Sequence, residues 1–219
     1  YEETVSGDIT AYIPHLTTGE SSWTDYLEVD NLTDSALSYT ITFYPEGGSA
    51  PVTRQIGAGA SEVVELKALD SQATCAKITT SKGVKLRAGH KNTATGGVAE
   101  FFLSDFSATN AGFFFTSFNE DIAWKGLAIM NPGDSEASVT LYAYGSSGLL
   151  GTTTTTVAAK NRSVALATTL FASLNLADIK HMVAVSNQAV LGIVITGNSD
   201  SSQITFTSAT SVSGFTAPQ

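Results

Sequence analysis

Two stretches decide the fold of this chain: LEVDNLTDSALSYTITFY at residues 27–44 and LAIMNPGDSEASVTLYAY at residues 127–144. They align without a gap at a shift of 100. Seven of the 18 positions carry the same residue, where average composition predicts about one. The identities are Leu27, Asn31, Asp34, Ser35, Ser38, Thr40 and Tyr44, each repeated 100 positions later. Such a match indicates an internal repeat of about 100 residues.

Weaker matches extend the repeat along the chain. They pair residues 55–64 with 156–165, residues 82–84 with 188–190, and Asn92 with Asn198. The shift grows from 100 to 106, as expected if insertions accumulate in loops. Trp23 matches Trp124 with a slip of one residue. The boundary falls between Leu103 and Gly112, in a short polar segment, so we predict two abutting domains at residues 1–107 and 108–219.

Each copy has the pattern of β-structure. Apolar and polar residues alternate with period two at 27–31 and 39–44, and again at 139–142. Asn, Asp, Ser, Pro and Gly lie between these runs, where turns are expected. One short helix per copy is predicted, at 66–73 and 167–176. The sequence therefore predicts an all-β fold of two tandem Ig-like antiparallel β-sandwiches, each with one short helical crossover.

Composition excludes several classes of function. The 219 residues carry a net charge of −9, with 11 Lys and Arg against 20 Asp and Glu, which disfavours nucleic acid and anionic lipid as partners. No apolar run reaches the roughly 18 residues of a membrane-spanning helix, so we expect no membrane insertion. Cys75 is the single cysteine, and its neighbours favour a buried apolar role. No cofactor is expected.

Several short motifs carry a resemblance to known proteins. Copy one contains Tyr12-Ile13-Pro14-His15, Trp23 and Leu27-x-Val29-x-Asn31, and copy two contains Leu170-Phe171 and the Val183–Gly192 run. The chain resembles the tandem β-sandwich repeats of uncharacterised exported and cell-surface bacterial proteins, over nearly its whole length. The resemblance implies an extracytoplasmic location, secreted or at the bacterial cell surface, and carries over no catalytic residue. A first residue other than Met fits a processed export product or a trimmed chain.

Candidate chemistry is sparse. His15, His90 and His181 show no metal-ligand spacing, and neither a nucleophile elbow nor a phosphate-binding glycine loop is present. Paired acids such as Asp25 with Glu28 could suit a glycosidase, but the repeat weighs against that reading. The Asn and Asp residues near Asn31 and Asn131 could hold turns or bind Ca²⁺, and we favour turns. We therefore predict no catalytic and no metal site, and expect a protein that is not an enzyme.

Aromatic residues give the remaining candidates. Seven of the eleven Phe residues lie between Phe101 and Phe118, across the predicted junction. Core packing and an inter-domain seal are the favoured interpretation, and an aromatic groove is the alternative. The candidate ligand-binding residues are Phe113, Phe114, Phe115, Phe118, Tyr12 and His15. The two Trp residues, at matching positions, are expected in the two cores rather than on a sugar-binding surface.

The sequence thus predicts a non-enzymatic structural or adhesion-type module with a protein or glycan surface partner. The alternative is a module that binds a carbohydrate or another small ligand through the junction aromatics.

Overall fold

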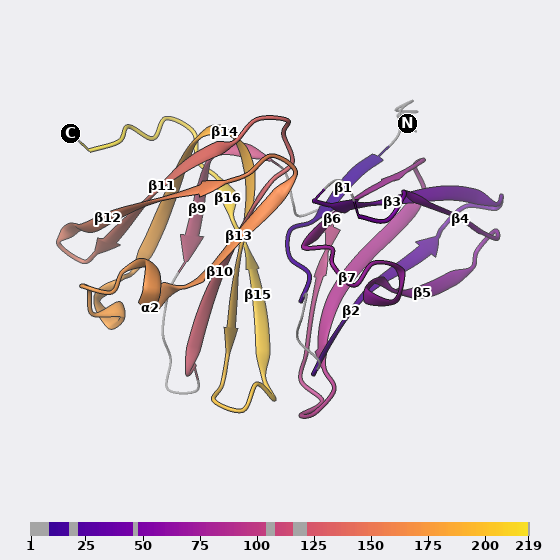
Figure 1. Cartoon of the computed structure of the whole chain (residues 1–219), viewed down its shortest axis with the longest axis horizontal. Helices are drawn as coiled ribbons and strands as arrows, with labels where there is room; N and C mark the ends of the chain where they lie inside the picture. The colour runs from indigo at the N-terminus through magenta and orange to yellow at the C-terminus, as the bar shows by residue number, and fades with distance from the viewer. Residues whose placement is uncertain (1–8, 18–21, 46–47, 104–107, 116–121, 219) are drawn as a thin grey trace.

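The computed structural model describes residues 9–17, 22–45, 48–103, 108–115 and 122–218 (Figure 1). Strands make up 59% of the protein and helices 6%, and the strand pairs are antiparallel. The predicted all-β class is confirmed. The narrower prediction of an Ig-like sandwich, with a boundary at residue 107, stays a prediction.

The first half forms two four-stranded sheets. One has the order β1-β6-β3-β4 and the other the order β5-β2-β7-β8. The strands are β1 (Ile9–Ile13), β2 (Trp23–Asn31), β3 (Leu37–Tyr44), β4 (Val52–Ile56), β5 (Ser61–Glu65), β6 (Cys75–Thr80), β7 (Val84–Asn92) and β8 (Val98–Phe102). Alternate residues of β2 and β7 point inward, so Leu27, Val29, Leu86 and Ala88 lie in the core between the sheets.

The second half repeats this strand order. The first part of β14 lies between β9 and β11, with β12 outside β11, and its second part lies between β10 and β15, with β13 outside β10. The long strand β14 therefore takes the places of both β6 and β7. The strands are β9 (Thr109–Phe115), β10 (Trp124–Asn131), β11 (Ala137–Gly145), β12 (Gly148–Val157), β13 (Asn161–Leu166), β14 (His181–Gly197), β15 (Ile204–Ser208) and β16 (Thr210–Ser211), which pairs with β9.

Strand registers agree with the repeat read from the sequence. Leu27 pairs with Ala88, and Leu127 pairs with Val194, which is 106 positions beyond Ala88. Thr40 faces Thr53 in β4, and Thr140 faces Thr154 in β12. The shift that grows along the sequence is therefore the shift that superimposes the two hydrogen-bonding patterns.

The repeated asparagines hold equivalent turns. The side chain of Asn31 donates to the carbonyls of Ser35 and Gly57, both at 2.8 Å, and accepts from the amide of Thr33 at 3.0 Å. Asn131 donates to the carbonyls of Ser135 and Val157 and accepts from the amide of Gly133. Both side chains are buried, so their polar atoms are used by the backbone. The structure thus places these residues in the turn role.

Each half has one short helix after its fifth strand, at α1 (Leu66–Leu69) and α2 (Ala167–Leu170), with a further 3₁₀ turn at Leu176–Asp178. Both helices start and end within the predicted segments but span a single turn. Within the described ranges, no helix has the length and apolar character needed to cross a membrane.

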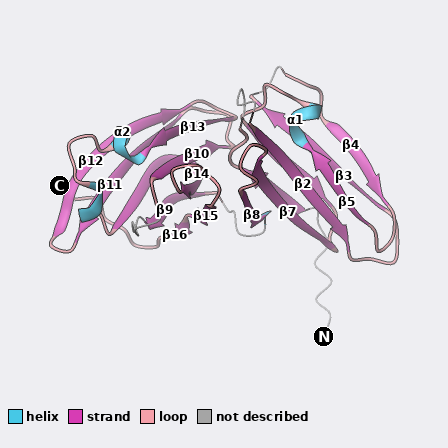
Figure 2. Cartoon of the chain, turned by 90° about the horizontal axis from the view of Figure 1, so that it is seen from below, coloured by secondary structure: helices cyan, strands magenta, loops and turns pink. Residues whose placement is uncertain are grey.

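The two halves share a hydrophobic core. The core of the first half continues into Ala128 and Met130 of β10 and into Leu191 and Ile193 of β14. These residues lie on the opposite face of their sheet from Leu127 and Ile129, which pack in the core of the second half. Figure 2 shows this contact at the centre of the molecule, where β8 lies beside β15. The sheet β13-β10-β14-β15 is consequently covered on both faces.

Candidate functional site

A cavity of about 520 Å³ lies where the halves meet. The first half contributes His15, Thr17, Trp23 and His90. The second half contributes residues of β10, β13, β14 and β15, among them Trp124, Arg162 and Phe206. This volume is within the range of small-molecule sites, about 300–1,000 Å³. The cavity therefore exists only because the two copies are packed together.

The tryptophan pair meets in this cavity. Trp23 begins β2 and Trp124 begins β10, and both indoles are half-buried. Trp23 shares the face of Leu27, which points into its own half. Trp124 shares the face of Met130, which points towards the other half. The slip of one residue between the copies reverses the face of the strand. Trp124 therefore does not point into the core of its own half, as was expected, and both indoles line the space between the halves.

A buried acid–imidazole pair supports the wall of the cavity. In β7, Nδ1 of His90 contacts Oδ1 of Asp25 across the β2–β7 register, and both side chains are buried. The second oxygen of Asp25 accepts from the amide and hydroxyl of Thr17, both at 2.9 Å. Burial opposes ionisation of Asp25, but these bonds and the charge of His90 outweigh it, and the pKa of Asp25 is lowered.

His15 lies next to this pair, with its ring centroid 5.2 Å from that of His90. Burial, followed by the charges of His90 and Arg162, lowers the pKa of His15 well below its ordinary value. Nδ1 of His15 and Nε2 of His90 are both buried, with no hydrogen-bond partner among the described residues. The ring of His90 also stacks on Phe206 at 4.9 Å. The two histidine rings therefore lie side by side in the cavity wall, with Phe206 stacked on His90.

Arg162 joins the halves beside the cavity. From β13, its Nε donates to the carbonyl of Thr74 at 2.6 Å and its Nη2 donates to the carbonyl of Leu16 at 2.8 Å. The neighbouring Asn161 accepts from the hydroxyl of Thr74 at 2.9 Å. Because the guanidinium group is fixed by bonds to the partner half, its position depends on the docking of the two halves.

Two hairpin turns meet on the other side of the junction, the β7–β8 turn of the first half and the β14–β15 turn of the second. The hydroxyl of Thr95 donates to the carbonyl of Ser201 at 3.0 Å, and Nε1 of Trp124 donates to the hydroxyl of Ser201 at 3.2 Å. Ser201 has a positive φ of 56°. Gly97 lies against the same turn, where an added Cβ would be 2.3 Å from the Ser201 carbonyl oxygen. Glycine is needed there because the two backbones approach so closely.

The predicted site residues separate in the structure. His15 lines the cavity, whereas Tyr12 is half-buried on β1 and packs against the first core. Phe114 is buried in the second core. Phe113 and Phe115 lie on β9, but their side chains, and Phe118 as a whole, fall outside the described residues. The aromatic residues found in the cavity wall are instead Trp23, Trp124 and Phe206.

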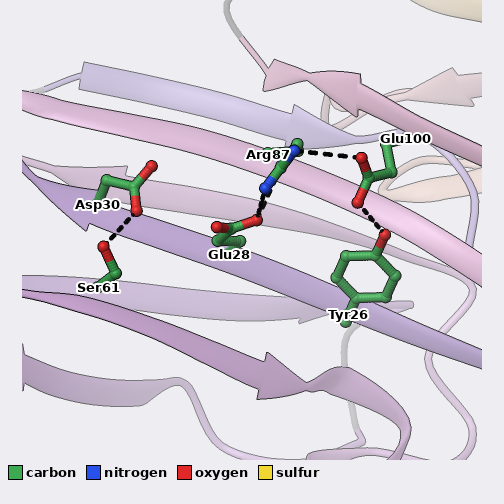
Figure 3. Close-up of polar contacts among 6 residues, drawn as sticks. All are labelled: Tyr26, Glu28, Asp30, Ser61, Arg87 and Glu100. Atoms are coloured by element: carbon green, nitrogen blue, oxygen red, sulfur yellow. Dashed lines mark hydrogen bonds and ion pairs between the residues drawn. The ribbon is translucent and has the colours of Figure 1, made fainter.

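The outer face of the first half is a paired polar surface (Figure 3). Arg87 bridges Glu28 and Glu100, the Tyr26 hydroxyl donates to Glu100, and Ser61 donates to Asp30 at 2.6 Å. Glu28 therefore points away from Asp25, which faces inward on the same strand. The two carboxylates considered for glycoside hydrolysis lie on opposite faces of β2 and cannot flank one bond.

Across the described part of the chain, His, Cys, Asp and Glu form no group of three or more that could hold a metal ion. Comparison with known proteins finds no matching family model and no matching curated relative. The geometry of the cavity and its wall is therefore the basis for assigning a function.

Proposed function

We propose that this chain is a non-enzymatic, extracytoplasmic binding module that takes a carbohydrate or a similar small ligand in the cavity between its halves. The observation that carries the proposal is the pair of half-buried indoles, Trp23 and Trp124, in one cavity of about 520 Å³. Indole faces supply apolar area for the C–H faces of a sugar ring, and the polar groups of the wall can fix its orientation.

Binding fits the wall better than catalysis does. The Asp25–His90 pair is the arrangement that orients a general base. A base must reach the proton that it removes, however, and Nε2 of His90 is buried, with no hydrogen-bond partner in the part of the chain that the structure describes. We therefore assign the pair to supporting the cavity wall. The extracytoplasmic location rests on the composition and on the resemblance to exported repeats.

The experiment is a glycan array followed by fluorescence titration. Trp23 and Trp124 are the two Trp residues of the chain, so intrinsic tryptophan emission reports on the cavity alone. A sugar found on the array should shift this emission with a saturating dependence on concentration. The variant Trp23→Ala should abolish binding while keeping the far-UV spectrum of the folded protein.

The matched control is Phe102→Ala, which removes an exposed aromatic ring outside the cavity. It should bind as the wild type does. Equal binding by Trp23→Ala and the wild type, or array hits that leave the emission unchanged, would place the ligand elsewhere. An array without any hit, together with no emission change on titration with mono- and disaccharides, would overturn the carbohydrate assignment.

A structural or adhesive role is the second candidate, and the shared core favours it. Because Met130 and Leu191 pack in the core of the first half, the two halves should bear load as one unit. Force spectroscopy of the chain should give one unfolding event for both halves. Two events, each with half of the contour length, would contradict this role for the junction.

A further inference from the structure

The outermost strand of the second half has an open edge. Among the described strands, β12 pairs with β11 alone, so its other edge is free of strand partners. It is ten residues long and lies at the end of the molecule away from the first half (Figures 1 and 2). Every second residue of an edge strand points its amide and carbonyl outward, where another chain can pair with them.

The corresponding edge of the first half carries several devices against strand pairing, whereas β12 carries one, an irregularity at residues 149–151 that lies outside the threonine run. The equivalent strand β4 has five residues, follows Pro51, and carries Arg54, which pairs with Glu62 at 2.8 Å. Proline, charge and shortness are the devices that prevent edge-to-edge pairing. The sequence of β12, GLLGTTTTTV, has neither proline nor charge.

The strands on the β12 side of the second half lack charged side chains. Strands β9, β11, β12, β14 and β16 contain no Asp, Glu, Lys or Arg. This contrasts with the charged face of the first half in Figure 3 and with a net charge of −9 for the chain. Two β12 strands can therefore pair without placing like charges of these strands opposite each other.

The run Thr152–Thr156 reads the same in both directions. In an antiparallel pair of identical strands related by a twofold axis at Thr154, each threonine faces a threonine, as an isologous contact requires. Threonine pairs of this kind already occur within the chain. Hydroxyls of Thr140 and Thr154 lie 3.2 Å apart between β11 and β12, and those of Thr40 and Thr53 lie 2.9 Å apart between β3 and β4.

We propose that β12 pairs antiparallel with β12 of a second copy of this chain, about a twofold axis at Thr154, and so joins two molecules through one continuous sheet. The contact is small compared with the roughly 1,200 Å² of a standard stable interface. It is therefore a weak dimer in dilute solution, and it is independent of the ligand proposed for the cavity.

The test is sedimentation velocity of the full chain over a concentration series, with two variants. Thr154→Lys places two like charges opposite each other at the axis and should lower the association constant at least about fivefold. Thr53→Lys introduces the same change at the equivalent exposed position of β4, and should associate as the wild type does. Far-UV spectra and melts establish that both variants are folded.

A charge-swap mixture separates loss of pairing from loss of fold. Thr154→Lys mixed with Thr154→Glu should form mixed dimers more readily than either variant forms dimers alone, and added salt should reduce this preference. A wild type that stays monomeric throughout the series would overturn the proposal. So would equal effects of Thr154→Lys and Thr53→Lys, or a mixture that associates no better than its components.

Discussion

Leu191→Ala tests whether the halves share one core. Leu191 lies on β14 in the second half, yet its side chain is 2% exposed and packs among residues of the first half. Removing a buried leucine costs about 2–5 kcal/mol. We expect the melting temperature to fall by roughly 5–15 °C. We also expect amides of β3 and β6, in the first half, to exchange hydrogen at least about tenfold faster.

The control is Leu141→Ala, which deletes an equally buried side chain that packs in the core of the second half. Under conditions where the protein stays folded, it should speed exchange in β11 and β12 and leave β3 and β6 at wild-type protection. Hydrogen exchange followed by mass spectrometry, with peptides assigned to each strand, gives both readouts. Wild-type protection of β3 and β6 in Leu191→Ala would refute the shared core.

Three further changes follow from particular contacts. Gly97→Ala should separate the hairpin tips, because its Cβ would be 2.3 Å from the Ser201 carbonyl oxygen, and should lower the melting temperature and red-shift tryptophan emission. His15→Gln should reduce acid sensitivity. The lowered pKa of His15 means that the unfolded chain binds a proton below about pH 6.5 that the folded chain does not, so stability falls with pH. Urea unfolding between pH 7 and pH 5 measures this loss of stability, and an unchanged pH dependence in the variant would contradict it. Asn131→Ala should cost about 1–3 kcal/mol by leaving turn carbonyls unpaired, with a comparable loss for Asn31→Ala, and chemical denaturation of each tests whether the repeated turns are equivalent.

Local patterns predicted the elements that depend on local chemistry. Alternation placed β2, β3 and β11, and the repeat predicted equivalent strands and the role of Asn31 and Asn131. These features follow from neighbours in sequence or from a fixed shift, so a single sequence contains them.

The cavity could not be predicted in the same way. It depends on which face of the second half docks against the first, and this face is decided by the packing of residues distant in sequence, such as Met130 and Phe101, into one core. The one signal available was the slip of Trp124 relative to Trp23. A shift of one position on a strand reverses the direction of the side chain, so that slip implied different environments for the two indoles.

In each half the chain passes once from the strand equivalent to β6 in one sheet to the strand equivalent to β7 in the other, and this passage matters for protein engineering. In the first half, β6 and β7 are separated by a turn at residues 81–83, where Gly83 has a φ of 87°. In the second half the same passage lies inside β14. There the side-chain oxygen of Asn187 accepts a hydrogen bond from the amide of Ser138 at 2.8 Å, which ties the segment to β11. Exposed turns tolerate nicks and inserted peptides, whereas a continuous strand does not. Residues 81–82 are therefore the place to insert an epitope, ahead of the Gly83 carbonyl that accepts from the amide of Leu32 at 2.8 Å, and residues 187–189 are the place to avoid.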